Sequence, residues 1–117
     1  MSHNNFKILS CFSILLILFS GCTQQIQNQQ NNQSQDLSEK AKQDCINLCQ
    51  SEKIKGTDLS NGPCLSDAIV EDWVCDVAHN PREAADNNPE NQCPAFGQGQ
   101  AHHFVEVDSD CNFIKKY

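Results

Sequence analysis

The sequence predicts a small, disulfide-rich α+β domain in which one N-terminal helix packs on a short antiparallel sheet, with much irregular loop. Six cysteines lie between residues 45 and 111 of the 117-residue chain, which is typical of a small exported domain held by disulfides. Segment 38–53 has helical periodicity, and two later runs alternate as strands do. A chain of this length has room for one such domain.

Residues 1–21 have the features of an export signal. Lys7 precedes an apolar run at 8–19, which is too short to span a bilayer core of roughly 30 Å and has the length of a signal-peptide core. The run leads into Leu-Phe-Ser-Gly before Cys22, which resembles the lipobox of prokaryotic lipoproteins but has Phe19 where Leu is usual. The resemblance implies that Cys22 is lipidated and anchors the chain to a membrane. The alternatives are an uncleaved anchor and a plain secretory signal.

A tether is expected at residues 22–35, because 23–35 contains seven Gln and three Asn. Such a tract has no apolar face to bury and should be flexible, which leaves 36–117 as the folded domain. Without residues 1–21 the chain loses Lys7 and no acid, so 7 basic and 15 acidic residues give a net charge of −8. This charge argues against nucleic acid as a partner. It is compatible with cations, a basic extracellular protein or a positively charged envelope polymer.

The helix is expected over 38–53, with Ser38 as its N-cap and Gly56 after its end. Its predicted apolar stripe comprises Leu37, Ala41, Cys45, Leu48 and Cys49. Cys45 and Cys49 therefore share a face one turn apart, and a bond between them would constrain little. Each is expected to reach a different segment of the domain.

The cysteines that remain after the signal and Cys22 are expected to form three disulfides. They are Cys45, Cys49, Cys64, Cys75, Cys93 and Cys111. A bond from Cys49 to Cys64 is favoured, and the other two pairings are left open. Metal ligation by these cysteines is the alternative, but Cys45-x3-Cys49 has no matching second pair.

Strands are predicted at 73–79 and 102–107. In the first, Trp73, Cys75, Val77 and His79 fall on one face and Val74, Asp76 and Ala78 on the other. The simplest core pairs the two strands antiparallel. Segment 65–72 is expected to be a short helix capped by Ser66 or Asp67. Segment 81–100 should be an irregular crossing tied down through Cys93, either functional or simply stapled. Asp108 is expected to start an Asx turn before Cys111.

A candidate site follows from the expected pairing of the two strands. One of His102 or His103 could then approach His79 or Asp76. Adjacent strand residues point to opposite faces, so at most one of the two histidines would join a single site. Imidazoles with a carboxylate could hold zinc or copper, or supply a general acid and base for hydrolysis. The alternative is that these histidines are hydrogen-bonded or solvated at strand ends.

Four segments of the chain carry a further resemblance. They are 58–64 (DLSNGPC), 72–82 (DWVCDVAHNPR), 91–93 (NQC) and 101–108 (AHHFVEVD). In these segments the chain resembles small cysteine-rich exported proteins of archaea. The resemblance implies export and disulfides and carries no activity. Together these features predict a membrane-tethered, extracytoplasmic binding or structural module on the outer face of the cytoplasmic membrane or the cell surface. Enzymatic activity is not expected, because no recognisable catalytic motif is present. The alternative function is a metal-binding or hydrolytic domain that uses Asp76, His79 and His102 or His103.

Overall fold

A computed structural model describes residues 22–117, with side chains described from residue 32 onward. The expected signal at 1–21 lies outside the described residues. The chain divides into two units, 1–34 and 35–117, and the second unit contains the sheet and the disulfides. Among residues 22–117 there is no helix with the length and apolar character needed for a membrane span.

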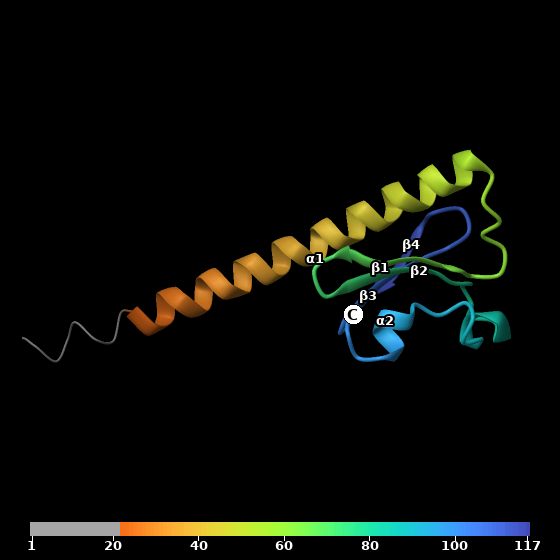
Figure 1. The fold of residues 1–117 in the computed structure, drawn as a ribbon. Coiled ribbons are helices and arrows are strands. Elements are labelled where there is room, and N and C mark those ends of the chain that lie inside the picture. The colour runs from red at the N-terminus through yellow and green to blue at the C-terminus, as the bar shows by residue number, and fades with distance from the viewer. Residues whose placement is uncertain (1–21) are drawn as a thin grey trace, which may run out of the picture. The chain divides into compact units, whose positions relative to one another are not determined.

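The helix α1 covers Cys22–Lys55 (Figure 1). It begins well before Ser38 and includes the tract for which the sequence predicts a flexible tether. Gln is a good helix former, and the tract contains no Gly or Pro to end a helix. The helix ends where expected, because Gly56 has a φ of 82° and the amide of Thr57 donates to the carbonyl of Glu52 at 3.0 Å. These are the features of a glycine C-cap.

Four strands form one sheet in the order β1-β2-β3-β4 (Figure 1). Their bounds are β1 Cys64–Val70, β2 Trp73–Val77, β3 His103–Val107 and β4 Phe113–Lys116. The outer pairs are antiparallel, whereas β2 and β3 run parallel. The α+β class and the strands near 73–79 and 102–107 are confirmed, but their predicted antiparallel pairing is wrong. The long connection between them leaves room for the crossover that parallel neighbours require.

Strand β1 occupies the segment that the sequence predicts as a short helix, so that prediction is wrong. Ser66 is not a helix cap but the register partner of Cys75 in β2. Ile69 and Val70 are β-branched and suit a pleated strand better than a helix. Asp72, with a φ of 66°, turns the chain into β2.

The two faces of the sheet are covered by different parts of the second unit. On one face, residues of α1 pack against the inward side chains of β2 and β3. The buried residues of this core include Ala41, Cys45, Cys49, Trp73, Cys75, Val77, Val105 and Val107. The predicted alternation in β2 is confirmed, because Val74 belongs to a separate cluster with Cys93 and Ala101. That second cluster lies under the connection from β2 to β3.

The connection from β2 to β3 contains the 3-10 helix η1 Ala84–Asn87 and the short helix α2 Pro94–Gly97. The rest is irregular, as predicted. Cys93 is bonded to Cys64, so the connection is fixed to the first residue of β1. This disulfide therefore holds the connection from β2 to β3 against the sheet face opposite α1.

Three disulfides are present, as predicted. They are Cys45–Cys75, Cys49–Cys111 and Cys64–Cys93. Cys45 and Cys49 reach different segments, but the favoured bond from Cys49 to Cys64 is wrong. Cys49 lies against the turn after β3, where its Sγ is 3.8 Å from the carbonyl oxygen of Asp108, and so it meets Cys111.

The turn between β3 and β4 has the predicted Asx chemistry. Asp108 Oδ1 accepts the backbone amides of Asp110 at 2.9 Å and of Asn112 at 2.8 Å. Cys111 within this turn has a φ of 67°. The Asp108 side chain thus accepts hydrogen bonds that a backbone carbonyl would accept in an ordinary turn. The turn places Cys111 next to α1.

Candidate functional site

A row of charged side chains crosses the sheet face opposite α1. Asp76 of β2 is the register partner of Glu106 of β3, and Glu106 is the partner of Lys115 of β4. Partner residues on neighbouring strands project from the same face. The row therefore brings two carboxyl groups and one ammonium side by side, and both acids are buried.

Arg82 fixes one of the two carboxyl groups. Its Nη1 donates to Glu106 Oε1 at 2.7 Å, while Nη2 and Nε donate to the Asp86 carbonyl and to Asn87 Oδ1. The second oxygen of Glu106 lies 3.4 Å from Lys115 Nζ. Glu106 is therefore neutralised by two cations and has a partner for each oxygen.

A cavity of about 150 Å³ opens above this row. Its lining combines the charged row with the connection from β2 to β3, and comprises Val74, Asp76, Arg82, Gln92, Cys93, Phe96, Phe104, Glu106 and Lys115. Phe96 and Phe104 form an edge-to-face pair with ring centroids 5.3 Å apart. The cavity thus has an aromatic part and a carboxyl part, a combination typical of small-ligand sites.

Asp76 is the unmatched member of the row. The residue is only 7% exposed, and its Oδ1 is buried without a hydrogen-bond partner among the described residues. Burial, followed by the neighbouring charge of Glu106, raises the pKa of Asp76 to about 7, and the Arg82 charge offsets this only in part. Such orphaned buried acceptors are rare because they cost free energy. A raised carboxyl pKa in a cavity is a recognised mark of a functional site.

His79 lies outside this cavity and has a partner of its own. Its Nδ1 is 2.8 Å from Asp86 Oδ1, and its backbone amide also donates to the same carboxylate. The amide of Glu83 donates to Asp86 Oδ2 at 2.8 Å. The hydrogen bond that the Asp86 carboxylate accepts from the His79 ring is the main cause that raises the pKa of His79. This buried carboxylate therefore organises the start of the crossover.

His102 and His103 gather around a different carboxylate, Asp72. His102 Nδ1 lies 2.7 Å from Asp72 Oδ1, and His103 Nε2 lies 3.6 Å from Asp72 Oδ2. The His103 ring stacks on Trp73 at 4.7 Å between centroids. Because β2 and β3 are parallel, this group sits where both strands begin, whereas His79 follows the end of β2. The structure does not bring Asp76, His79 and either of these histidines together.

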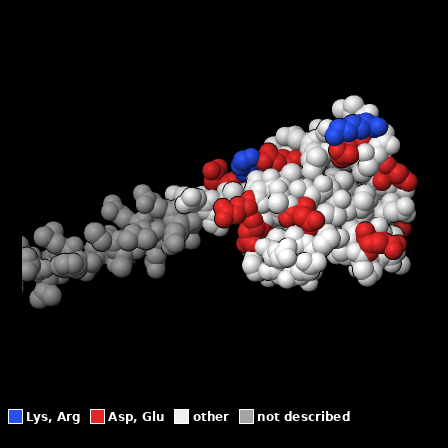
Figure 2. Space-filling model, in the orientation of Figure 1, with Lys and Arg blue, Asp and Glu red and all other residues white. Residues whose placement is uncertain are grey.

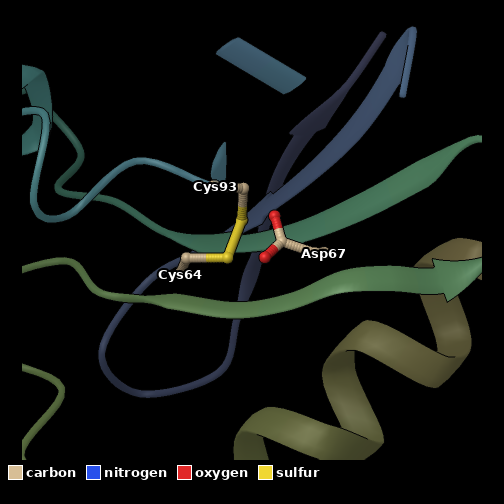
Figure 3. Close-up of side chains that lie close together, drawn as sticks. All are labelled: Cys64, Asp67 and Cys93. Atoms are coloured by element: carbon tan, nitrogen blue, oxygen red, sulfur yellow. A yellow bond between two sulfur atoms is a disulfide. The ribbon is translucent and has the colours of Figure 1, made fainter. Parts of the chain in front are cut away.

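One group of potential metal ligands occurs within the part of the chain that the structure describes, comprising Cys64, Asp67 and Cys93. Figure 3 shows that the two sulfur atoms in it are joined as a disulfide, with the Asp67 carboxylate beside them. A disulfide sulfur has no thiolate to offer a metal. Asp67 instead accepts the backbone amide of Ala95 at 2.8 Å, which fastens α2 to β1.

The sequence pointed to Asp76 but not to the residues that accompany it. Glu106 lies beside Asp76 because β2 and β3 run parallel, and the sequence alone does not give the relative direction of the two strands. Arg82, the single arginine of the chain, was a signal that charge is buried, because arginine is the preferred partner for a buried carboxylate.

Comparison of the chain with protein-family models, curated proteins and solved structures finds no match.

Proposed function

We propose that the chain is an exported binding module, tethered to the outer face of the membrane through Cys22, and that its ligand enters the cavity above Asp76. The observation that carries the binding role is the buried Asp76 oxygen without a partner at a cavity of about 150 Å³. A ligand that donates a hydrogen bond there would remove an energetic cost that the free domain bears.

The three disulfides support the location, because they are typical of an oxidising compartment. The acidic surface is compatible with it as well. Figure 2 shows acidic side chains spread over the displayed face, with few basic ones. The partner would therefore carry positive charge, as a basic extracellular protein or envelope polymer does.

Fractionation of cells that produce the full chain tests the tether. The wild-type chain should be found with membranes and resist extraction by high salt, whereas Cys22→Ser should be released. Cys11→Ser is the matched control, since it removes a cysteine from the expected signal and should leave membrane association unchanged. Equal membrane association of the two variants would refute the lipid tether without touching the binding role.

A further inference from the structure

We infer that the cavity binds a primary ammonium group, carried by a small free amine or by a lysine side chain of a partner protein. This inference rests on the proposed binding function and names its ligand class. It follows from the distribution of donors and acceptors around Asp76, from the position of Lys115, and from the shape and charge of the cavity.

In the part of the chain that the structure describes, the cavity contains one unpaired hydrogen-bond acceptor, and its two cations, Arg82 and Lys115, already have partners. Both oxygens of Glu106 are occupied by Arg82 and Lys115, and Arg82 uses its remaining nitrogens on Asn87 and on the Asp86 carbonyl. Asp76 Oδ1 has no donor among the described residues. An ammonium group carries three donors and no acceptor, so one of its N–H groups can satisfy Asp76 Oδ1, and it brings no acceptor of its own that would need a donor there.

Lys115 shows that the walls of this cavity accommodate an ammonium group. Its Nζ lies 3.4 Å from Glu106 Oε2 and 5.3 Å from the centroid of the Phe104 ring. The side chain is about half exposed, so it lies at the mouth and does not fill the cavity. A second ammonium placed deeper would find the same kinds of partners, a carboxylate and an aromatic face.

The dimensions and charge agree with this class of ligand. A cavity of about 150 Å³ holds one small organic group, about the size of benzene. Phe96, Phe104 and Val74 can cover an aliphatic stem while Asp76 meets the charged end. Arg82 and Lys115 also line the cavity, but both are paired with Glu106, and the net charge of the whole chain, −7, would repel an anionic ligand.

The test compares three isosteric probes on the full chain purified from an exporting host. Amide chemical shifts are followed during titration with n-butylammonium, n-butanol and butyrate. We expect n-butylammonium alone to shift residues lining the cavity, with a dissociation constant on the order of millimolar, as suits so small a ligand. The two controls that carry no positive charge should leave these residues unchanged.

Variants locate the binding. Asp76→Asn should weaken n-butylammonium binding by about 30-fold or more, because it removes a buried charge partner. Glu71→Gln removes an exposed acid from the turn between β1 and β2 and should have no effect. Lys115→Met should tighten binding several-fold, because it removes a competing cation at the mouth. The disulfides of each variant are checked by thiol alkylation before titration.

The outcomes separate the ligand class from the binding role. Binding of n-butanol equal to that of n-butylammonium, or binding of butyrate that Lys115→Met weakens, would overturn the ammonium class while the binding module stands. No binding of any probe would overturn both. A peptide, acetyl-Gly-Lys-Gly-amide, distinguishes the sources. Binding at least as tight as that of n-butylammonium supports a protein lysine, and exclusion of the peptide supports a free amine.

Discussion

Asp76 and Glu106 are register partners on neighbouring parallel strands, yet their carboxyl groups differ in the hydrogen-bond and charge partners that they have. Glu106 is matched by Arg82 and Lys115, whereas Asp76 Oδ1 is buried without a partner among the described residues. This asymmetry is the basis for the binding site that we propose on the sheet face opposite α1. It also has consequences for stability that can be measured without a ligand.

Asp76→Asn should stabilise the free domain at about pH 8. The folded-state pKa of Asp76 is raised from 3.8 to about 7, so between these values the folded state holds a proton that the unfolded state has lost. Stability therefore falls as pH rises through this window, by up to a few kcal/mol, and stays low above it. Denaturant unfolding from about pH 4 to pH 8 should show this loss in the wild type and a smaller loss in the variant. Parallel pH profiles for the two chains would contradict the prediction.

Asp86→Asn should destabilise the start of the crossover. Asp86 is buried and accepts from the amides of His79 and Glu83 and from the His79 ring. The new amide nitrogen would face one of these donors, at a cost of about 1–3 kcal/mol. Asp110→Asn, at an exposed carboxylate that pairs with Lys53, is the control and should cost far less. The measurement is the free energy of unfolding at about pH 6, where the His79 contribution is present.

The pair formed by His79 and Asp86 predicts a second pH effect. The pKa of His79 is raised above 6.5 by Asp86, so its contribution is complete below about 6.5 and is lost as pH rises through the folded-state value. A histidine ring titration followed by chemical shift should give a pKa above 6.5 in the wild type and a lower one in Asp86→Asn. An unchanged His79 titration in that variant would show that Asp86 is not its main partner.

Gly62→Ala should be more harmful than Gly56→Ala, although both glycines have a positive φ. A Cβ at Gly62 would meet Asp86 Oδ1 at 2.7 Å and the carbonyl oxygen of Val77 at 3.0 Å, whereas one at Gly56 would meet nothing within 4 Å. Gly56→Ala should cost about 1 kcal/mol from backbone strain alone, and Gly62→Ala should cost clearly more. Urea unfolding of both variants makes the comparison, and equal losses would contradict the close approach at Gly62.

Removal of the Cys49–Cys111 disulfide should cost the domain a large part of its stability. The bond joins residues 62 positions apart, and the loop-entropy model gives about 4 kcal/mol for a loop of that length. The double variant Cys49→Ala/Cys111→Ala should unfold at lower denaturant concentration and keep two disulfides. Peptide mapping of the wild type checks the pairing first, and a Cys49–Cys64 peptide would contradict it.

Two of the four strands and the buried face of α1 were predictable from sequence, because they depend on periodicity, whereas β4 was not predicted. The alternation of Trp73, Cys75 and Val77 predicted β2, and the spacing of Cys45 and Cys49 predicted the face of α1. The prediction of a helix at 65–72 was wrong because Ser66 and Asp67 resemble a helix cap. The pairing that β1 gains with β2 outweighs that local signal.

The candidate site was only partly predictable, because it depends on strand direction. Antiparallel pairing would have placed His102 or His103 near His79, which is why these residues were grouped. Parallel pairing instead places the two groups at opposite ends of the strands and sets Glu106 beside Asp76. The length of the connection between the strands was the one signal in the sequence that favoured the parallel arrangement.

The most direct test of the proposed binding site is a pH titration of the Asp76 carboxyl group by side-chain chemical shift, with and without n-butylammonium. Our interpretation predicts a pKa near 7 in the free chain, and a clear fall when n-butylammonium is added, because the cation favours the ionised form. n-Butanol should leave the titration unchanged. An Asp76 pKa near its ordinary value, unaffected by the amine, would contradict both the unmatched carboxyl group and its role in binding.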